Sequence, residues 1–218
     1  MQTQKYGRTY HFPFSEGATS DDKILQDWEN ILTEELVMTE KLDGENTCLK
    51  ASGVYARSHG SPTRNPWAGN MWPIWERVSN DLGDLEVFGE NLYGVHSIEY
   101  EQLPYFFFVF AIRDGERWLS WEEVLFYAEL LELPTIPVLE IGRFEAAQIK
   151  QLIADRMEQG SVFGGDCEGF VFRNADSFHV DDFKNNVLKY VRRNHVKTNQ
   201  HWTRNWQKAK LWYQRSFK

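Results

Sequence analysis

The segment Lys41-Leu42-Asp43-Gly44-Glu45 places a lysine where it could act as a nucleophile. The apolar run Leu36-Val37-Met38 precedes it, and Thr47-Cys48-Leu49 resumes an extended pattern after Gly44. We therefore expect Lys41 at the end of a strand, facing a loop, where a deprotonated amine could attack phosphorus. Lysine, aspartate and glycine are also common in solvated hairpin turns, so this interpretation needs support from the rest of the chain.

Charged residues recur beside apolar, strand-like runs downstream of Lys41. In chain order the segments are Ala56-Arg57-Ser58, Phe88-Gly89-Glu90-Asn91-Leu92-Tyr93-Gly94, Tyr105 to Ile112, Glu168-Gly169-Phe170-Val171-Phe172-Arg173 and Val187-Leu188-Lys189-Tyr190-Val191-Arg192. The run from Tyr105 to Ile112 is typical of a buried aromatic strand. Several motifs in a fixed order are far more specific than the lysine motif alone.

This ordered set resembles the covalent nucleotidyltransferases, the superfamily of ATP-dependent polynucleotide ligases and capping guanylyltransferases. It is most similar to the second type of phage RNA ligase and its bacterial relatives, and the similarity includes Lys5-Tyr6-Gly7-Arg8-Thr9 and residues 17–23. The resemblance implies an α+β fold in which two antiparallel sheets flank a nucleotide pocket, as in the ATP-grasp-like ligase domain, with peripheral helices. It also implies an ATP-dependent RNA ligase: AMP is attached to Lys41, moves to an RNA 5′-phosphate and is displaced by a 3′-hydroxyl.

That reaction assigns roles to the charged residues of the motifs. A free lysine has a pKa of about 10.4, so Lys41 must lose its proton before it attacks the α-phosphorus of ATP. Lys189 and a bound Mg²⁺ or Mn²⁺ would supply cationic charge that lowers the pKa of this amine, and Lys189 would also hold the α-phosphate. Asp43 and Glu168 are the predicted metal-site carboxylates, because hard cations prefer oxygen ligands. The predicted catalytic residues are thus Lys41, Asp43, Glu168 and Lys189.

For the nucleotide, the resemblance implies that Glu90 accepts a hydrogen bond from a ribose hydroxyl, that Phe110 stacks on adenine and that Arg57 meets the ribose or the phosphates. Glu40, directly before the lysine, and Arg192 complete the predicted ATP-binding set.

Two positions depart from the pattern of similar ligases. Ala111 stands where relatives often have aspartate, which leaves the choice between Phe108 and Phe110 open. Many ligases have two lysines one residue apart in the last motif, whereas here Arg192 or Lys184 would supply the second charge.

Length and composition fit one catalytic domain over residues 1–218. The 218 residues are 42% hydrophobic, which is enough for one sizeable core, and no uninterrupted apolar run of about 18 residues predicts a membrane span. The first residues lack the apolar region of a secretory signal, and the two cysteines, Cys48 and Cys167, have no disulfide or zinc spacing. We therefore expect buried, free cysteines and a cytoplasmic protein that does not contact membranes.

Charge is distributed unevenly along the chain. The formal net charge is −8, yet residues 183–218 contain ten Lys or Arg and no Asp or Glu. Trp202, Trp206, Trp212 and Tyr213 lie among these cations, a pattern that suggests contacts with RNA phosphates and stacked bases. The same tryptophans recur near helical spacing, so an amphipathic helix that docks on the domain is an equal alternative, and both can hold.

Three helices are predicted from capping signals and apolar spacing. The first is capped by Ser20 and has Ile24, Leu25, Trp28, Ile31 and Leu32 on one face, with its end before the Val37 strand left open. Ser120 and Glu123 form a capping box for the second. The third runs from about residue 145 towards residue 157 and ends at Gly160.

Three other functions share part of this evidence. A minimal ATP-dependent DNA ligase would carry the same motifs, although such ligases usually have an oligonucleotide-binding domain in addition. A capping guanylyltransferase would use GTP and normally has such a domain too. A non-catalytic nucleotide- or RNA-binding module has no need of a reactive lysine beside a metal site. For a ligase of this length, joining of RNA ends could depend on an accessory repair or RNA-binding protein.

Overall fold

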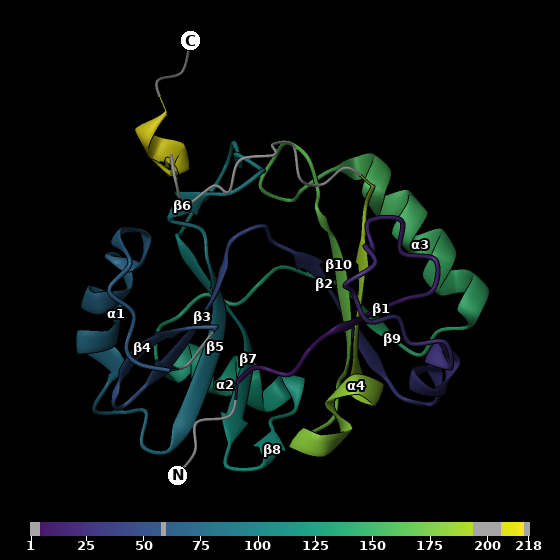
Figure 1. The fold of residues 1–218 in the computed structure, drawn as a ribbon, viewed down its shortest axis with the longest axis horizontal. Coiled ribbons are helices and arrows are strands. Elements are labelled where there is room, and N and C mark those ends of the chain that lie inside the picture. The colour runs from purple at the N-terminus through teal and green to yellow at the C-terminus, as the bar shows by residue number, and fades with distance from the viewer. Residues whose placement is uncertain (1–4, 58–59, 194–205, 216–218) are drawn as a thin grey trace.

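Two β-sheets face each other and form the body of the molecule (Figure 1). The computed structural model describes residues 5–57, 60–193 and 206–215. The first sheet has the strand order β1-β12-β10-β2-β9, with bounds β1 Tyr10–His11, β12 Val187–Val191, β10 Gly169–Asn174, β2 Leu36–Lys41 and β9 Val138–Gly142. Its pairings are antiparallel except that β1 runs parallel to β12.

The second sheet is antiparallel throughout, in the order β11-β8-β7-β5-β3-β4. Its strands are β11 Phe178–His179, β8 Arg117–Trp118, β7 Phe107–Asp114, β5 Leu85–Asn91, β3 Glu45–Lys50 and β4 Gly53–Ala56. A small third sheet joins β6 (Gly94–Val95) to β13 (Gln207–Lys208), so the C-terminal segment returns to the second sheet. The predicted α+β class with antiparallel sheets is confirmed.

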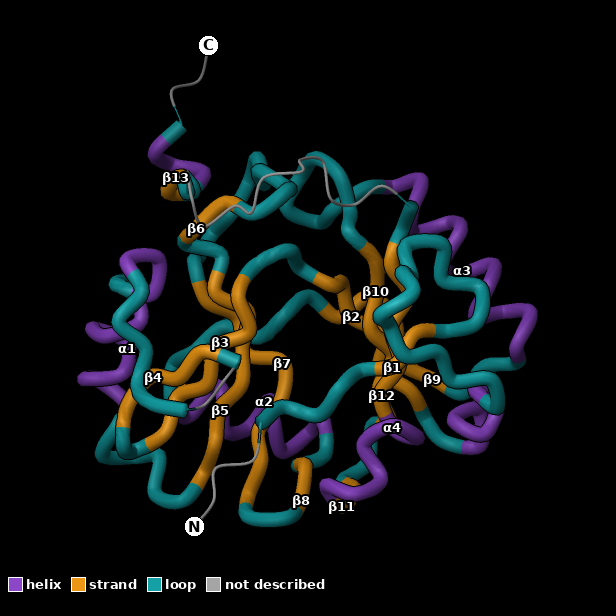
Figure 2. The backbone as a smooth tube through the Cα atoms, viewed as in Figure 1, coloured by secondary structure: helices purple, strands orange, loops and turns teal. Residues whose placement is uncertain are grey.

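Helices lie on the outside of the two sheets (Figure 2). Their bounds are α1 Met71–Val78, α2 Trp121–Leu130, α3 Ala146–Gln159 and α4 Phe183–Asn186, with short 3-10 helices at Trp28–Thr33, Pro66–Ala68, Val180–Asp182 and Trp212–Gln214. The capping box of α2 is present as predicted, because Ser120 and Glu123 each bond the other's backbone N–H. The prediction for α3 is also confirmed, and Gly160 ends it with a φ of 74°.

Strand alternation decides which side chains reach the space between the sheets. In the first sheet, Phe170 and Phe172 point outward and pack under α3 in a core that includes Ile149. The alternate residues of the same sheet therefore point inward. Gly169 pairs with both Lys41 and Val191, and Val171 pairs with both Thr39 and Lys189. The two lysines therefore lie on the inner face, two residues apart along the strand direction.

One predicted helix is wrong. The segment after Ser20 becomes helical only at Trp28–Thr33, because residues 23–25 exchange backbone hydrogen bonds with His11 instead: His11 N donates to Lys23 O and Leu25 N donates to His11 O. Of the C-terminal segment, residues 206–215 form β13 and a 3-10 helix rather than the alternative amphipathic helix. Trp202 and Arg204 of that segment lie outside the described residues.

Further sequence expectations concern cysteines and membranes. Cys48 and Cys167 are free and buried, as predicted. Within the described ranges, no helix is long and apolar enough to span a bilayer.

Candidate active site

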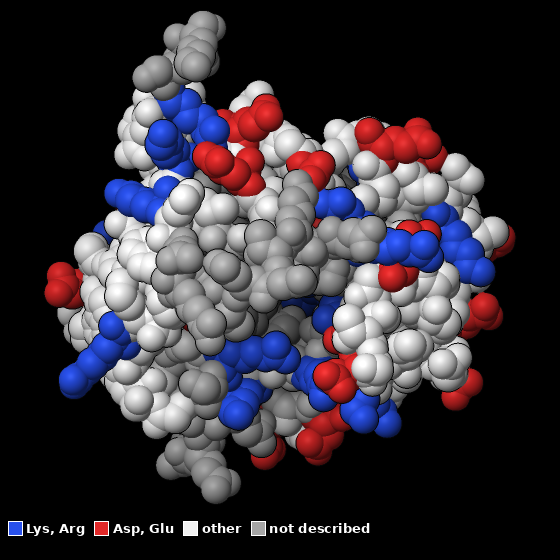
Figure 3. Space-filling view, turned by 45° about the horizontal axis from the view of Figure 1, so that its top comes forward, with Lys and Arg blue, Asp and Glu red and all other residues white. Residues whose placement is uncertain are grey.

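A cleft of about 920 Å³ lies between the inner faces of the two sheets. The first sheet contributes Thr39, Lys41, Val171, Arg173, Val187 and Lys189 to its lining, and the second sheet and its loops contribute Asn46, Arg57, Glu90, Phe110 and Ala111. Figure 3 shows Lys and Arg side chains gathered around a hollow in this face of the molecule. A cleft with cations at its mouth suits an anionic ligand.

Lys41 is the last residue of β2, and its ammonium is held by a carboxylate. Nζ lies 2.5 Å from Oε2 of Glu168, the residue directly before β10. Burial favours the neutral amine, but the charges of Glu168 and then Glu90 outweigh it and raise the pKa of Lys41. The ligand-free amine is therefore protonated. The expected lowering of its pKa by nearby cations does not occur in the protein alone.

Glu90 approaches Lys41 from the opposite sheet. It lies in β5, and its Oε1 accepts a hydrogen bond of 3.0 Å from Gly44 N, so it fixes the turn that follows the lysine. Burial raises the pKa of Glu90 to about 8, Lys41 opposes the rise, and Glu168 adds to it. The cleft thus holds two carboxylates, one from each sheet, around one ammonium.

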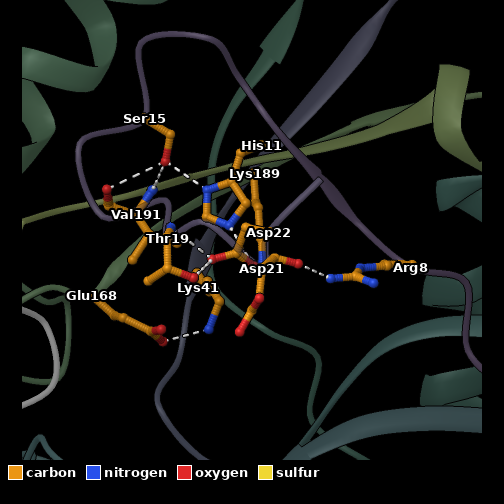
Figure 4. Close-up of polar contacts among 10 residues, drawn as sticks. All are labelled: Arg8, His11, Ser15, Thr19, Asp21, Asp22, Lys41, Glu168, Lys189 and Val191. Atoms are coloured by element: carbon orange, nitrogen blue, oxygen red, sulfur yellow. Dashed lines mark hydrogen bonds and ion pairs between the residues drawn. The ribbon is translucent and has the colours of Figure 1, made fainter. Parts of the chain in front are cut away.

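Lys189 provides a second amine on the inner face of the first sheet. Its Nζ lies 3.9 Å from Asp22 Oδ1, and Figure 4 shows the two side chains close to Lys41. Burial, and then the positive charges of Lys41 and Arg57, lower the pKa of Lys189 to about 8, while Asp22 and Glu168 oppose the fall. This lysine is therefore closer to neutrality than Lys41 at pH 7 to 8.

The far end of the cleft is aromatic. Phe110 lines it beside Tyr6, whose ring centre is 5.1 Å away, together with Trp118. Phe108 instead packs against Phe163 at 5.0 Å and does not line the cleft, so the structure favours Phe110 of the two candidates. Arg173 is buried here and donates hydrogen bonds to backbone carbonyls, which leaves this end largely apolar.

Besides Glu168, which meets the cleft through its bond to Lys41, three predicted site residues lie outside the lining of the cleft. Asp43 Oδ2 accepts hydrogen bonds from Ser97 N at 2.7 Å and Ile98 N at 2.8 Å, so this oxygen anchors a loop. Glu40 points to the other face of β2, where Oε2 accepts from Val162 N at 3.0 Å. Their assigned roles stay predictions.

The third is Arg192, which lies just after β12. Its guanidinium is 3.1 Å from Asp166, away from the cleft lining. Lys184, the other candidate for a second charge, lies on α4 and is exposed.

No preformed metal cage is visible in the part of the chain that the structure describes. Groups of three or more His, Cys, Asp or Glu side chains arranged for a metal are absent there. Glu168 and Glu90 nevertheless bring carboxylate oxygens to Lys41 from two sides. Carboxylate oxygens completed by water and substrate phosphates suit Mg²⁺ or Mn²⁺, which rarely need an all-protein cage.

Comparison with known proteins identifies the family. A sequence profile of the RNA ligase family matches residues 34–191, which include Lys41, Glu90, Phe110, Glu168 and Lys189. The chain belongs to the RNA ligase family. No curated protein matches it.

Solved structures of ligases share the fold of this RNA ligase family member. A putative ATP-dependent DNA ligase of Aquifex aeolicus is 22% identical, with a TM-score of 0.58 over 87% of this chain and 50% of its own. An archaeal ATP-dependent RNA ligase is 15% identical, with a TM-score of 0.59 over 87% and 48%. An RNA ligase of Naegleria gruberi with pyrophosphate is 22% identical, with a TM-score of 0.56 over 88% and 60%. The chain thus spans about half the length of the first matches, and at these identities the likeness concerns the fold.

Several residues that line the cleft had no role predicted from the sequence. Asp22 was placed inside a predicted helix, although Thr19 and Asp22 are spaced as in a side-chain-capped turn. Arg173 is the last residue of the motif that begins at Glu168, and it had no predicted role. Tyr6 and Arg8 belong to the N-terminal segment used for the resemblance, and only the fold brings them to the cleft.

The buried Glu90 predicts a stability that depends on pH. Its pKa of about 8 in the folded protein lies above the ordinary value of 4.5, so folding takes up a proton between these values. This contribution is complete below pH about 4.5 and is lost as pH rises through about 8. Glu90→Gln should therefore gain stability relative to the wild type as pH rises from 5 to 8.5, as measured by urea unfolding. The exposed Glu76→Gln serves as the control, and parallel pH curves for wild type and Glu90→Gln would contradict the assignment.

Proposed function

We propose that this RNA ligase family member is an ATP-dependent RNA ligase that works through AMP bound to Lys41. The observation that carries the proposal is the constellation in the cleft: Lys41 at a strand end, bonded to Glu168 and facing Glu90, with Lys189 on the same sheet face. A binding module would gain nothing from a lysine held at the point where two motif carboxylates meet.

In the first step, Nζ of Lys41 attacks the α-phosphorus of ATP, the bond to the β-phosphate oxygen breaks, and pyrophosphate leaves. The amine must first lose its proton. Glu168 Oε2, at 2.5 Å, is placed to take it. The raised pKa of Lys41 in the ligand-free protein means that this transfer belongs to the substrate-bound state, since a free lysine that stayed neutral would be reactive towards other electrophiles.

The remaining cleft residues suit the parts of ATP. Lys189 and Arg57 offer cations for the phosphates, where negative charge accumulates in the transition state. Glu90 would accept a hydrogen bond from a ribose hydroxyl, and Phe110 would stack on adenine at the aromatic end. This distribution supports the ATP-grasp-like arrangement, with the nucleotide held between two sheets.

A divalent cation fits the same end of the cleft. Mg²⁺ or Mn²⁺ held by Glu168, and by Asp43 if its second oxygen is used, would neutralise phosphate charge and favour the deprotonated amine. Solved relatives support this, because a point mutant of the Naegleria gruberi ligase was obtained with ATP and Mn.

The later steps need RNA ends. AMP would pass from Lys41 to an RNA 5′-phosphate, and a 3′-hydroxyl would then displace it. We place all of residues 1–218 in one nucleotidyltransferase domain, with the basic segment 183–218 serving the RNA. We expect an accessory repair or RNA-binding protein where the chain alone joins ends slowly. Free, buried cysteines support a reducing, cytoplasmic setting.

A DNA ligase is the second candidate. The Aquifex aeolicus match, described as a putative ATP-dependent DNA ligase, shares the fold to the same degree as the RNA ligases. The family profile favours RNA. The choice therefore depends on the nucleic acid that is sealed.

The nucleophile is tested by labelling. With α-labelled ATP and magnesium, the wild type should acquire label, and Lys41→Ala and Lys41→Arg should acquire none, because neither can form the phosphoramidate. Lys150→Ala, at an exposed position on α3, is the control for loss of a lysine, and α-labelled GTP tests for a capping enzyme. Wild-type labelling in Lys41→Ala would place the nucleophile elsewhere.

The nucleic acid is tested by the sugar at the joint. An RNA ligase can read the 2′-hydroxyl of the 3′-end, so sealing with a fixed 5′-phosphate strand should require a ribonucleotide 3′-end. Gel assays with matched ribose and deoxyribose ends measure this preference. Equal sealing of all-DNA ends would favour the DNA ligase.

The basic C-terminal segment should bind the strand. Lys208 and Lys210 are exposed beside Trp206, while the neighbouring Ala209 and Leu211 are buried and fix the segment on the domain. Neutralising both lysines with glutamine should weaken RNA binding several-fold and reduce the salt slope by about one to two, with ATP labelling unchanged.

Arg143 and Lys150, exposed near α3 on the outer side of the first sheet, provide the matched double-glutamine control. If the two double variants bind RNA equally tightly, with the same salt slope, the C-terminal cations are solvated and do not contact RNA.

A further inference from the structure

An N-terminal segment, residues 9–23, is fastened to the strand that carries Lys189. β1 pairs in parallel with β12, and His11 is in register with Lys189. Further along, Ser15 Oγ accepts a hydrogen bond of 2.9 Å from Val191 N, and Gly17 N donates to Val191 O at 2.7 Å. The segment therefore follows β12 along its whole length and then turns towards the cleft.

The turn delivers Asp22 to the cleft in a fixed orientation. Oδ2 accepts two hydrogen bonds from Thr19, one from its backbone N at 3.0 Å and one from Oγ1 at 2.9 Å. Oδ1 is thereby directed to the other side, 3.3 Å from His11 Nε2 and 3.9 Å from Lys189 Nζ (Figure 4). One carboxylate thus connects a surface turn, a buried histidine and the second lysine of the cleft.

His11 contacts this carboxylate from the buried side of the turn. It is 2% exposed, and its Nδ1 lies 2.8 Å from Ser15 Oγ. Burial, and then Lys189, lower the pKa of His11 to about 4, so the ring is neutral near pH 7 and carries one proton. Its Nε2 lies near Asp22 Oδ1 without forming a hydrogen bond of normal geometry, while Nδ1 contacts the Ser15 hydroxyl.

We propose that Asp22 is a positioning residue for Lys189: its carboxylate holds the ammonium at the mouth of the cleft until a substrate phosphate takes its place. The role in catalysis rests on the proposed ligase function, whereas the pairing itself does not. An anionic partner offsets part of the cost of burying the lysine. The two side chains are 3.9 Å apart and partly exposed to solvent, so a phosphate can replace Asp22 beside Lys189 while water solvates the released carboxylate.

The charges around Lys189 give the direction of the effect. Asp22 and Glu168 favour its ammonium, Lys41 and Arg57 oppose it, and His11 is neutral. Without Asp22, two cations face the lysine against a carboxylate that already bonds Lys41. The pKa of Lys189 would then fall, and less of it would be charged at pH 8, where phosphate binding needs the ammonium.

A purely structural role for Asp22 is the competing explanation, because the same side chain caps Thr19. Asp21→Asn is the matched control, since it makes the same charge change in the same turn at an exposed position. Asp22→Asn keeps an oxygen that can accept from Thr19 and removes the charge alone. Thermal unfolding of both variants establishes that the segment remains folded.

The first measurement does not involve activity. With ¹³C-lysine labelling, the Lys189 side-chain signal is assigned by its loss in Lys189→Arg and titrated by NMR. Asp22→Asn should lower the pKa of Lys189 by on the order of one unit, and Asp21→Asn should leave it unchanged. If Asp22→Asn does not fold, Thr19→Val, which frees the carboxylate without removing it, should shift the same pKa in the same direction by less. An unchanged pKa in the folded variants would overturn the proposal.

The second measurement connects the pair to chemistry. Single-turnover labelling of Lys41 with ATP at pH 8 should slow several-fold in Asp22→Asn and recover in Asp22→Glu. In a Lys189→Ala background, Asp22→Asn should cause no further loss, because Asp22 acts through Lys189. An equal loss in both backgrounds would overturn the positioning role. If the wild type is not labelled at all, the proposed function fails, while the NMR titration still decides whether Asp22 holds Lys189.

Discussion

The ammonium of Lys41 is paired with Glu168, and the turn that follows the lysine is fixed by Glu90 from the opposite sheet. Glu168 belongs to the first sheet and bonds it at 2.5 Å, and Glu90 belongs to the second and bonds the turn after it through Gly44. A buried ammonium is costly unless it is paired, and Glu168 supplies that pairing, while Glu90, whose pKa of about 8 leaves it largely protonated at neutral pH, fixes the turn beside the lysine. The cleft is therefore part of what sets the relative position of the sheets, and a change in any of the three residues affects both chemistry and architecture.

In the same arrangement, two groups of the cleft have pKa values close to physiological pH. Glu90 and Lys189 each have a pKa of about 8, one raised and one lowered mainly by burial. Near that pH, small changes in local charge alter which groups are ionised. A triphosphate that enters with its cation is such a change. The ligand-free protein keeps Lys41 protonated, and the groups around it can respond when substrate binds, which confines the reactive amine to the complex.

Local patterns predicted the parts of the site that depend on strand alternation. Lys41 at the end of β2, Glu168 before β10 and Lys189 within β12 all follow from apolar runs and their interruptions. The same rule explains why Glu40 fails to reach the cleft: neighbouring residues of a strand point to opposite faces, so Glu40 and Lys41 cannot both face inward. Asp22 could not be found in this way. Its position depends on backbone pairing between residues 23–25 and His11, a long-range contact that overrides the helical spacing of residues 20–32.

Ala111 and the buried Arg173 both line the cleft at its aromatic end. The Arg173 guanidinium donates to Leu119 O at 2.7 Å and Asn174 O at 3.0 Å, and it lies 5.7 Å from the ring centres of both Trp121 and Phe178. Carbonyl oxygens and ring faces stabilise the cation where a carboxylate partner would add a second buried charge. Burial still lowers the pKa of Arg173 to about 10, which leaves it charged at physiological pH. Ala111 brings no carboxylate to this end of the cleft, so stacking on Phe110 would be the contact that holds a base there.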